Sequence, residues 1–263
     1  MFYPLVPLLG SATKVSDYVK IPLFSVQVTL FPNSGISIGL TNHHSLCDAS
    51  TRFNFLKAWT SIARHGTDEV FLTTGSLPFY DRAIKYPSLL DEIYLSQPGI
   101  EAFNGEYRTP ELVSQTDKVR ATIVLTQDHI NRLKKWLSSE LPRLEYISSF
   151  SVACAFVWSC VAKSRGNNEN DDDIERCGDM VRAYQPVPTI GVSGTPKTKI
   201  YDVDFGWGKP KKHETISIDY NGSISVNACK DSSVDMEIGL SLPAKQMDAF
   251  ISISREVLES LFM

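Results

Sequence analysis

The sequence predicts a globular protein that contains both β-strands and α-helices. Hydrophobic residues make up 43% of its 263 residues, which is enough to form a substantial core. Strict alternation of apolar residues between Phe24 and Leu30 indicates a strand with one apolar face. The stretch SSFSVACAFVWSCVAKS at 148–164 is instead apolar on nearly all sides, as expected of a helix buried between layers.

Charge and hydropathy argue against two classes of partner. With 26 Lys and Arg residues against 30 Asp and Glu residues, the net charge of -4 does not favour nucleic-acid binding. No run approaches the roughly 20 apolar residues of a membrane span, and the opening MFYPLVPLLG lacks the basic start of a secretory signal. We therefore expect a cytoplasmic protein that binds neither membranes nor nucleic acids.

The first half of the chain predicts a hairpin followed by a helix. The alternation at 24–30 is repeated at 36–40, and Pro32, Asn33, Ser34 and Gly35 between them supply turn chemistry. From 49 to 63 the apolar residues follow helical spacing instead. The segment HHSLCD at 43–48 therefore lies where a strand gives way to a helix.

Residues 66–118 predict a surface excursion, because their periodicity is weak and they contain four prolines. We place a linker at 98–118 within this stretch, between a first domain at 1–97 and a second at 119–263.

The second domain is predicted to contain both strands and helices. Residues 121–126 predict a strand, and the next helix, with apolar residues from Ile130 to Leu137, could be capped by Thr126. The acidic run at 166–175 indicates a solvated loop. Alternations at 215–218, 223–226 and 237–240 favour an antiparallel meander with a tight turn at 220–222, before a closing helix at 243–261.

Two histidines are the candidates for chemistry. His43 and His44 follow a strand and precede a helix, where a side chain can project from a rigid edge into a cleft. Imidazole, with an ordinary pKa near 6.5, can take a proton from a hydroxyl at neutral pH. A surface or structural role is the alternative for such a pair.

Other kinds of site are poorly supported. Adjacent histidines diverge and HExxH is absent, so His43 and His44 do not predict a metal site together with Asp48. GVSG at 191–194 lacks the GxSxG elbow of serine hydrolases. Five scattered cysteines without a CxxC pair predict reduced thiols rather than a zinc or redox centre: Cys47, Cys154, Cys160, Cys177 and Cys229.

Two motifs resemble those of the BAHD acyltransferases of plants. His44-Ser-Leu-Cys-Asp48 matches their HxxxD motif, and DFGWG at 204–208 is identical to their second motif. The resemblance continues through FLKAW at 55–59, the helix at 148–160 and the segments 204–229 and 236–250. The last two segments are most similar to the branch that malonylates anthocyanins and other phenolic glucosides.

The resemblance implies a two-domain α/β fold of the chloramphenicol-acetyltransferase type, with mixed sheets flanked by helices and an active site in a channel between the domains. It also implies direct acyl transfer from acyl-CoA, above all malonyl-CoA, to a hydroxyl of a phenolic or flavonoid glucoside. His44 would act as the general base, and no covalent acyl-enzyme, bound cofactor or metal would be needed. The expected enzyme is a monomer.

The resemblance also assigns supporting roles. Asp48 would shape the catalytic loop by accepting a charge-assisted hydrogen bond. Asp204 would act as a structural support, with Phe205, Gly206, Trp207 and Gly208 completing a tight loop in which Trp207 packs. Arg52, eight residues after His44 and about two helical turns along, could bind the malonyl carboxylate, although a solvated arginine is the competing interpretation.

The chain departs from the family in length. BAHD enzymes have two domains of about 200 residues each, whereas only 42 residues precede His43 here. The family's DxRxR and YFGNC stretches are missing between residues 165 and 204. We therefore expect a fold that is incomplete in this chain, and a catalytically inactive, scaffold-like relative is the alternative to an active enzyme.

Overall fold

The computed structural model divides into two compact units, Met1–Val113 and Ser114–Met263, which we describe separately. The residues that it describes are 2–74, 77, 81, 83, 85–96, 117–143, 146–165, 190–194, 196–221 and 223–261. The predicted acidic loop and all but the last two residues of the predicted linker lie outside this set. The domain boundaries stay a prediction.

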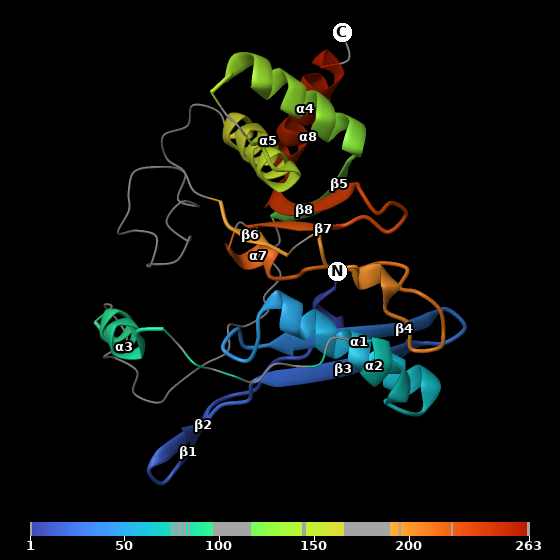
Figure 1. Cartoon of the computed structure of the whole chain (residues 1–263). Coiled ribbons are helices and arrows are strands. Elements are labelled where there is room, and N and C mark those ends of the chain that lie inside the picture. Colours follow the sequence, from blue (N-terminus) through green and yellow to red (C-terminus); the bar gives the residue numbers. More distant parts are fainter. Residues whose placement is uncertain are drawn as a thin grey trace. The chain divides into compact units, whose positions relative to one another are not determined.

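A β-hairpin forms the centre of the first unit, as predicted (Figure 1). β3 (Phe24–Phe31) pairs antiparallel with β4 (Gly35–Asn42), in a register that runs from Phe24 opposite Asn42 to Phe31 opposite Gly35. The turn places Asn33 at a φ of 59° and closes with a hydrogen bond from the Ser34 N–H to the Phe31 oxygen (3.0 Å). A smaller hairpin of β1 (Thr13–Val15) and β2 (Tyr18–Lys20) precedes it.

The N-terminal segment crosses the polar face of the β3–β4 hairpin. The Gln27 side chain donates a hydrogen bond to the Pro4 oxygen (2.7 Å), and the Thr41 hydroxyl donates one to the Pro7 oxygen (2.6 Å). Between them, Gly39 lies so close to the Leu5 carbonyl that a Cβ atom there would clash with it. This segment contains a short 3-10 helix, η1 (Tyr3–Leu5).

Helix α1 (Ala49–His65) confirms the helix predicted at 49–63. It ends at Gly66, whose φ of 71° allows its N–H to bond the Ile62 oxygen (2.8 Å). The Phe55 ring meets Phe24 of β3 edge-on, with 5.5 Å between ring centroids. Two further helices, α2 (Glu69–Thr74) and α3 (Pro87–Leu95), form within the stretch that we predicted to be a surface excursion.

The second unit contains a four-stranded mixed sheet in the order β5-β8-β7-β6. β5 (Lys118–Leu125), β8 (Met236–Pro243) and β7 (Ile224–Ala228) are antiparallel neighbours, and β6 (Val192–Ser193) joins β7 in parallel. The predicted strands at 121–126, 223–226 and 237–240 are thus confirmed. The strand predicted at 215–218 is wrong, since residues 215–217 form no strand and α7 (Ile218–Asn221) begins at Ile218. Of the turn predicted at 220–222, residues 220 and 221 are helical instead.

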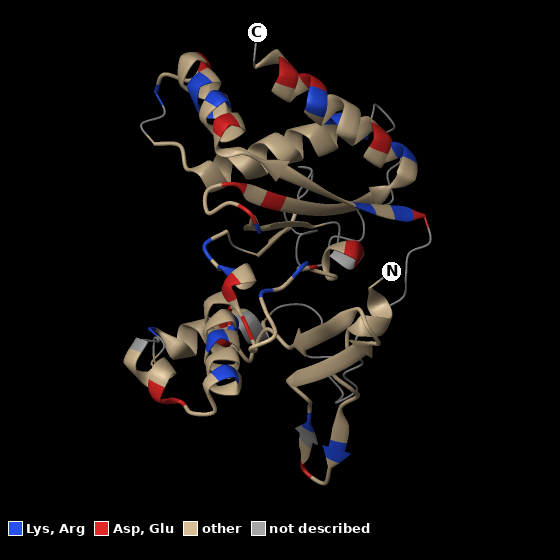
Figure 2. Ribbon diagram, turned by 90° about the vertical axis from the view of Figure 1, so that its right-hand side faces the viewer, with Lys and Arg blue, Asp and Glu red and all other residues tan. Residues whose placement is uncertain are grey.

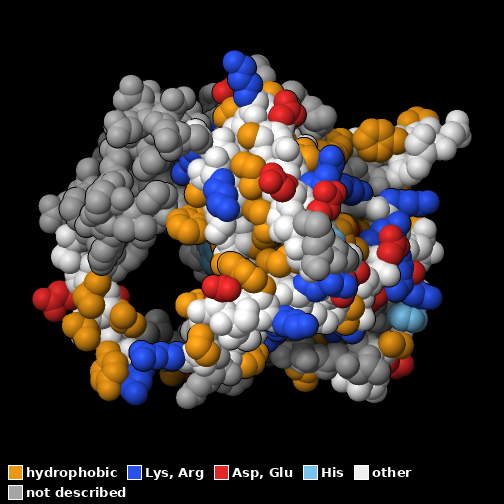
Figure 3. Space-filling view, turned by 90° about the horizontal axis from the view of Figure 1, so that it is seen from above, with side chains coloured by type: hydrophobic (Ala, Val, Ile, Leu, Met, Phe, Trp, Pro, Cys, Tyr) orange, Lys and Arg blue, Asp and Glu red, His pale blue; other side chains and the backbone are white. Residues whose placement is uncertain are grey.

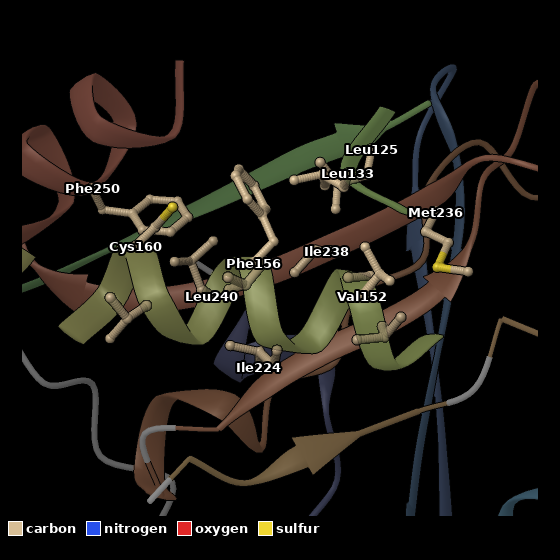
Figure 4. Packing of buried hydrophobic residues seen from close by; sticks show 14 of the residues in the cluster. Leu125, Leu133, Val152, Phe156, Cys160, Ile224, Met236, Ile238, Leu240 and Phe250 are labelled. Carbon is tan, nitrogen blue, oxygen red and sulfur yellow. The ribbon is translucent and has the colours of Figure 1, made fainter. Parts of the chain in front are cut away.

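Three helices cover one face of this sheet, and the core lies between them and the strands (Figures 1 and 4). They are α4 (Gln127–Glu140), α5 (Ser149–Ser164) and α8 (Ala244–Ser260). Fully buried members of the core include Leu125, Val157, Ile238 and Phe250. Thr126 caps α4, as predicted, by accepting a hydrogen bond from the His129 N–H (3.2 Å).

The three helices differ in how far they are buried. α5 contributes six buried residues, yet Phe150 and Trp158 are exposed, so the prediction of burial on nearly all sides was too strong. α4 and α8 are less buried and carry charged residues on their surfaces (Figure 2).

The face seen from above mixes charged and hydrophobic side chains (Figure 3). Within the described part of the chain, no helix has the length and hydrophobicity needed to cross a membrane.

Candidate active site

The HHSLCD segment forms a turn between a strand and a helix, as predicted. β4 ends at Asn42, and the His43 N–H continues the pairing by donating to the Leu23 oxygen (2.9 Å). The chain then turns, with a hydrogen bond from the Leu46 N–H to the His43 oxygen (3.1 Å), and α1 begins at Ala49. Hydrogen bonds therefore fix the backbone on both sides of His44.

The two adjacent histidines have different surroundings. Nδ1 of His43 accepts a hydrogen bond from the Ser45 N–H (3.2 Å) and lies 2.7 Å from the Ser45 hydroxyl. Nδ1 of His43 is therefore engaged by Ser45 within the turn. The His44 side chain is exposed, and its ring has no hydrogen-bond partner among the described residues. His43 thus belongs to the turn, while the His44 ring remains accessible.

Asp48 is the N-cap of α1. Its side-chain oxygen accepts a hydrogen bond from the Thr51 N–H (2.7 Å), one of the donors that a helix start leaves unpaired. This bond, together with a second one from the Thr51 side chain and the nearby His44, lowers the pKa of the Asp48 carboxyl below its usual 3.8. Asp48 therefore fixes the start of the helix four residues after His44.

Arg52 lies in the first turn of α1, with an exposed side chain. The expectation that it stands two helical turns beyond His44 is wrong, because His44 precedes the helix and only the residues from Ala49 onward are helical. The first turn contains no acidic residue. A cation at a helix N-terminus is mildly unfavourable because the helix dipole is positive there.

The DFGWG motif forms a tight loop in the second unit. The Asp204 carboxylate accepts hydrogen bonds from the N–H groups of Gly206 (2.8 Å) and Gly208 (2.9 Å). Both glycines have positive φ values, 98° and 101°, which side chains other than glycine rarely adopt. Asp204 therefore organises its own loop, and the two glycines make the path of the chain possible.

The two aromatic residues of the motif stack on each other, with 5.7 Å between their ring centroids. Phe205 is half-buried, whereas Trp207 is 71% exposed. The expected packing of Trp207 is thus met only by its contact with Phe205. In the described residues, no group of three or more His, Cys, Asp and Glu side chains could hold a metal ion.

The structure brings three of the predicted site residues, His44, Asp48 and Arg52, together in one strand–turn–helix segment, while Asp204 and the rest of the DFGWG motif belong to the other unit. Sequence reasoning missed three residues near the DFGWG motif: Arg120, Tyr201 and Glu237. The bond between Arg120 and Asp219 joins residues 99 positions apart, and the bond between Tyr201 and Glu237 joins residues 36 positions apart, so no local spacing could reveal these two contacts.

Comparison with known proteins assigns the family. A sequence model described as the Transferase family matches residues 5–181 and 174–256. The chain belongs to this family, the BAHD acyltransferases. The two matched segments overlap at residues 174–181. These residues lie within 165–204, the region where we expected an internal shortening.

Similar BAHD relatives are malonyltransferases of plants. A malonyl-coenzyme A:anthocyanin 3-O-glucoside-6''-O-malonyltransferase of Dahlia pinnata is 42% identical over 98% of this chain and 71% of its own length. An anthocyanin 5-O-glucoside malonyltransferase of Salvia splendens is 31% identical (97% and 69%). Phenolic glucoside malonyltransferase 1 of Nicotiana tabacum is 30% identical (86% and 65%). The chain thus spans about two thirds of these relatives.

Solved structures confirm the α/β fold. Vinorine synthase matches with a TM-score of 0.59 at 18% identity, covering 94% of this chain and 69% of that enzyme. A protein of F. graminearum, solved with coenzyme A and deoxynivalenol, matches with a TM-score of 0.52 at 13% identity, covering 87% and 67%. The BAHD fold with mixed sheets and flanking helices is therefore present, although this chain is shorter than both.

Proposed function

We propose that the chain is an acyl-CoA-dependent O-acyltransferase that moves a malonyl group from malonyl-CoA to a hydroxyl of a phenolic or flavonoid glucoside. The observation that carries this proposal is 42% identity to an anthocyanin malonyltransferase across 98% of the chain. Two further relatives at 30% identity or more are also malonyltransferases, one for an anthocyanin glucoside and one for phenolic glucosides.

His44 is the proposed general base. Its ring takes the proton of the acceptor hydroxyl, and the hydroxyl oxygen forms a bond to the thioester carbonyl carbon of malonyl-CoA. The tetrahedral intermediate then breaks its carbon–sulfur bond, and the departing thiolate of CoA receives the proton from His44. General-base help of this kind is worth roughly 10²–10⁴-fold, so holding both substrates together must supply much of the remaining acceleration. The exposed His44 ring and the separate engagement of His43 support this assignment.

Three further residues are proposed to support the reaction. Asp48 keeps His44 at a fixed distance from α1 through its cap on the Thr51 N–H. Arg52, in the first turn of that helix, is the proposed partner of the malonyl carboxylate. Asp204 acts in the DFGWG loop, where it accepts two backbone hydrogen bonds. The HxxxD and DFGWG motifs thus have different tasks, one at the reacting hydroxyl and one in the protein scaffold.

We propose that malonyl-CoA acts as a co-substrate and that no other cofactor is bound. The acceptor carries a sugar hydroxyl and an aromatic aglycone. A monomeric state, a cytoplasmic location and the absence of membrane and nucleic-acid partners stay predictions from the sequence.

The test is an assay of free CoA release from malonyl-CoA with a panel of phenolic and anthocyanin glucosides. We expect release to require both an acceptor and His44, and the product to gain the mass of one malonyl group. Acetyl-CoA serves as the comparison donor. If no acceptor gave faster CoA release than a His44→Ala control, the proposal would be rejected. The inactive, scaffold-like alternative would then hold.

A further inference from the structure

The DFGWG motif lies within a loop whose ends meet. The Tyr201 hydroxyl accepts a hydrogen bond from the His213 N–H (3.3 Å), which joins the two ends of residues 201–213. The same hydroxyl donates to Glu237 on β8 (3.0 Å). Tyr201 is buried, with 6% of its surface exposed. One side chain thus closes the loop and fastens it to the sheet, as in the compact Ω-loops of many functional surfaces.

The Tyr201 hydroxyl keeps its proton under all ordinary conditions. Burial raises the pKa of Tyr201 to about 12, although the His213 N–H opposes this shift. The hydroxyl can therefore donate to Glu237 while it accepts from His213. Glu237 uses its other oxygen to accept a hydrogen bond from the Lys230 N–H (3.3 Å).

Polar contacts, more than burial, set the shape of the loop interior. Gly206, Trp207, Gly208 and Lys209 are all exposed. Asp204 holds the two glycines, and Lys209 forms an ion pair with Asp202 (2.8 Å). Since the tip of the loop buries little surface, its conformation depends on where its ends are held.

Arg120 on β5 provides a second anchor directly after the loop. Its Nε lies 2.8 and 3.0 Å from the two carboxylate oxygens of Asp219, Nη1 bonds Glu214 (3.0 Å), and Nη2 bonds the Thr215 carbonyl (2.9 Å). The planar guanidinium therefore binds three residues of one segment through donors in a fixed planar arrangement, which the ammonium group of a lysine does not have. Asp219 is buried, whereas the Arg120 and Glu214 side chains each keep 21% of their surface exposed, so the network is partly shielded from solvent.

Both anchors lie on the same face of the sheet. Arg120 and Glu237 alternate along their strands with core residues such as Ala121 and Ile238, so their side chains lie on the face opposite α4, α5 and α8. The loop and the segment after it are thus held at two points of one rigid surface.

We propose that Tyr201 and Arg120 are positioning residues of the transferase, which act on the reaction by holding the closed DFGWG loop on the sheet. Neither residue is proposed to touch a substrate. The inference rests on the proposed function, because the loop matters to catalysis only if the chain is a transferase. Positioning by a fixed loop predicts that loosening either anchor impairs substrate binding in protein that is still folded.

The first arm of the test measures hydrogen exchange of the Gly206 and Gly208 amides. Tyr201→Phe removes only the hydroxyl and keeps the buried ring, and we expect at least about tenfold faster exchange at both glycines. Tyr146→Phe is the matched control, since Tyr146 is 84% exposed, and it should leave the exchange unchanged. Equal exchange in Tyr201→Phe and wild type would overturn the claim that this hydroxyl holds the loop.

The second arm separates positioning from simple stabilisation. Loss of folded protein lowers the maximal rate but leaves KM unchanged, whereas a displaced loop raises KM. We expect Tyr201→Phe and Arg120→Lys to raise KM for malonyl-CoA or the acceptor about threefold or more, well below their unfolding temperatures. Glu237→Gln retains a hydrogen-bond acceptor for Tyr201, so its KM values should stay closer to those of wild type. Arg132→Lys is the control for Arg120, because Arg132 forms an exposed ion pair with Asp128.

The outcomes distinguish the two proposals. Faster loop exchange with unchanged KM values would overturn the positioning role and leave the anchors merely structural. An inactive wild-type chain would reject the proposed function and the positioning role with it. In that case the exchange comparison would still decide whether the Tyr201 hydroxyl closes the loop.

Discussion

Neighbouring side chains of one turn can have separate tasks, and the two histidines of the HxxxD segment illustrate this at the scale of single residues. His43 accepts the Ser45 N–H and so stabilises the turn that places His44. His44 uses neither ring nitrogen for a hydrogen bond within the described residues. The HxxxD motif was enough to identify His44 in the sequence. Only the structure showed that His43 is bound to Ser45.

Replacing the two histidines should separate their roles. His44→Ala should lower turnover at least about a hundredfold, since the proposed base is lost. His43→Ala should cost at most a few-fold, through a looser turn. Steady-state rates of CoA release measure both, with the folded fraction checked by circular dichroism. Equal losses in the two variants would contradict the assignment of a single base.

Arg52 offers a test of donor choice. If its guanidinium binds the malonyl carboxylate, Arg52→Ala should weaken the use of malonyl-CoA by about 1.5–3 kcal/mol while acetyl-CoA is hardly affected. The quantity to compare is kcat/KM for each donor. Arg64 in the last turn of the same helix provides a control, because Arg64→Ala should leave donor preference unchanged. A similar loss with both donors would mean that Arg52 is only a solvated side chain.

At the scale of elements, the HxxxD motif is the junction between β4 and α1, and Asp48 is the residue that starts the helix. The lowered pKa of its carboxyl couples this cap to pH. Because the folded pKa lies below the unfolded value, the stabilisation is fully present above about pH 4 and is lost as pH falls through the folded pKa. At neutral pH the cap is therefore intact.

Substitutions at Asp48 can test the cap. Asp48→Ala should destabilise the folded chain by about 0.5–2 kcal/mol at neutral pH, since a helix donor loses its partner. This difference should shrink as the pH falls from about 4 through the lowered folded pKa, at which the carboxyl of the folded wild type becomes protonated. Asp48→Asn keeps an acceptor without the charge, so it should be nearly as stable as wild type at neutral pH. Urea unfolding at neutral pH and below about pH 4 gives the free energies of unfolding. A difference between Asp48→Ala and wild type that stays constant with pH would argue against the ionised cap.

Periodicity predicted the elements that have one clearly apolar face. The β3–β4 hairpin, α1, α4 and β8 were found because each repeats its apolar residues over several turns or pleats. β6, with two residues, and α7, with four, are too short for any such pattern. Residues 215–218 resemble a strand by alternation, but Arg120, more than 90 residues away, holds Glu214, Thr215 and Asp219 against the sheet face instead.

At the scale of the whole molecule, the chain is shorter than its relatives. The match to the Dahlia malonyltransferase extends over 330 residues, 67 more than the whole chain contains, so the relative has internal residues without a counterpart here. This agrees with the expectation that the chain is internally shortened. The motifs could be recognised from sequence because they are short and contiguous, whereas the completeness of the surrounding sheets depends on residues far apart.

The apolar face of the β3–β4 hairpin is the clearest physical consequence. Val28 is 60% exposed and Leu30 is 69% exposed, in a sheet that consists of two strands among the residues that the structure describes. Covering a side chain of this size stabilises a protein by roughly 1.5–3 kcal/mol, so an uncovered face favours association with other apolar surfaces. We therefore expect the purified chain to bind a hydrophobic dye and to associate as its concentration rises.

The double variant Val28→Thr/Leu30→Thr tests this expectation. Threonine keeps the β-branched shape that suits a strand while removing apolar surface, so the hairpin should persist. Dye fluorescence and light scattering should both fall relative to wild type, with little loss in the free energy of unfolding. Val119→Thr is the matched control, because Val119 is an exposed valine on β5 of the other unit, and it should change neither signal. If the double variant bound as much dye as wild type, the source of association would have to lie elsewhere than on this face.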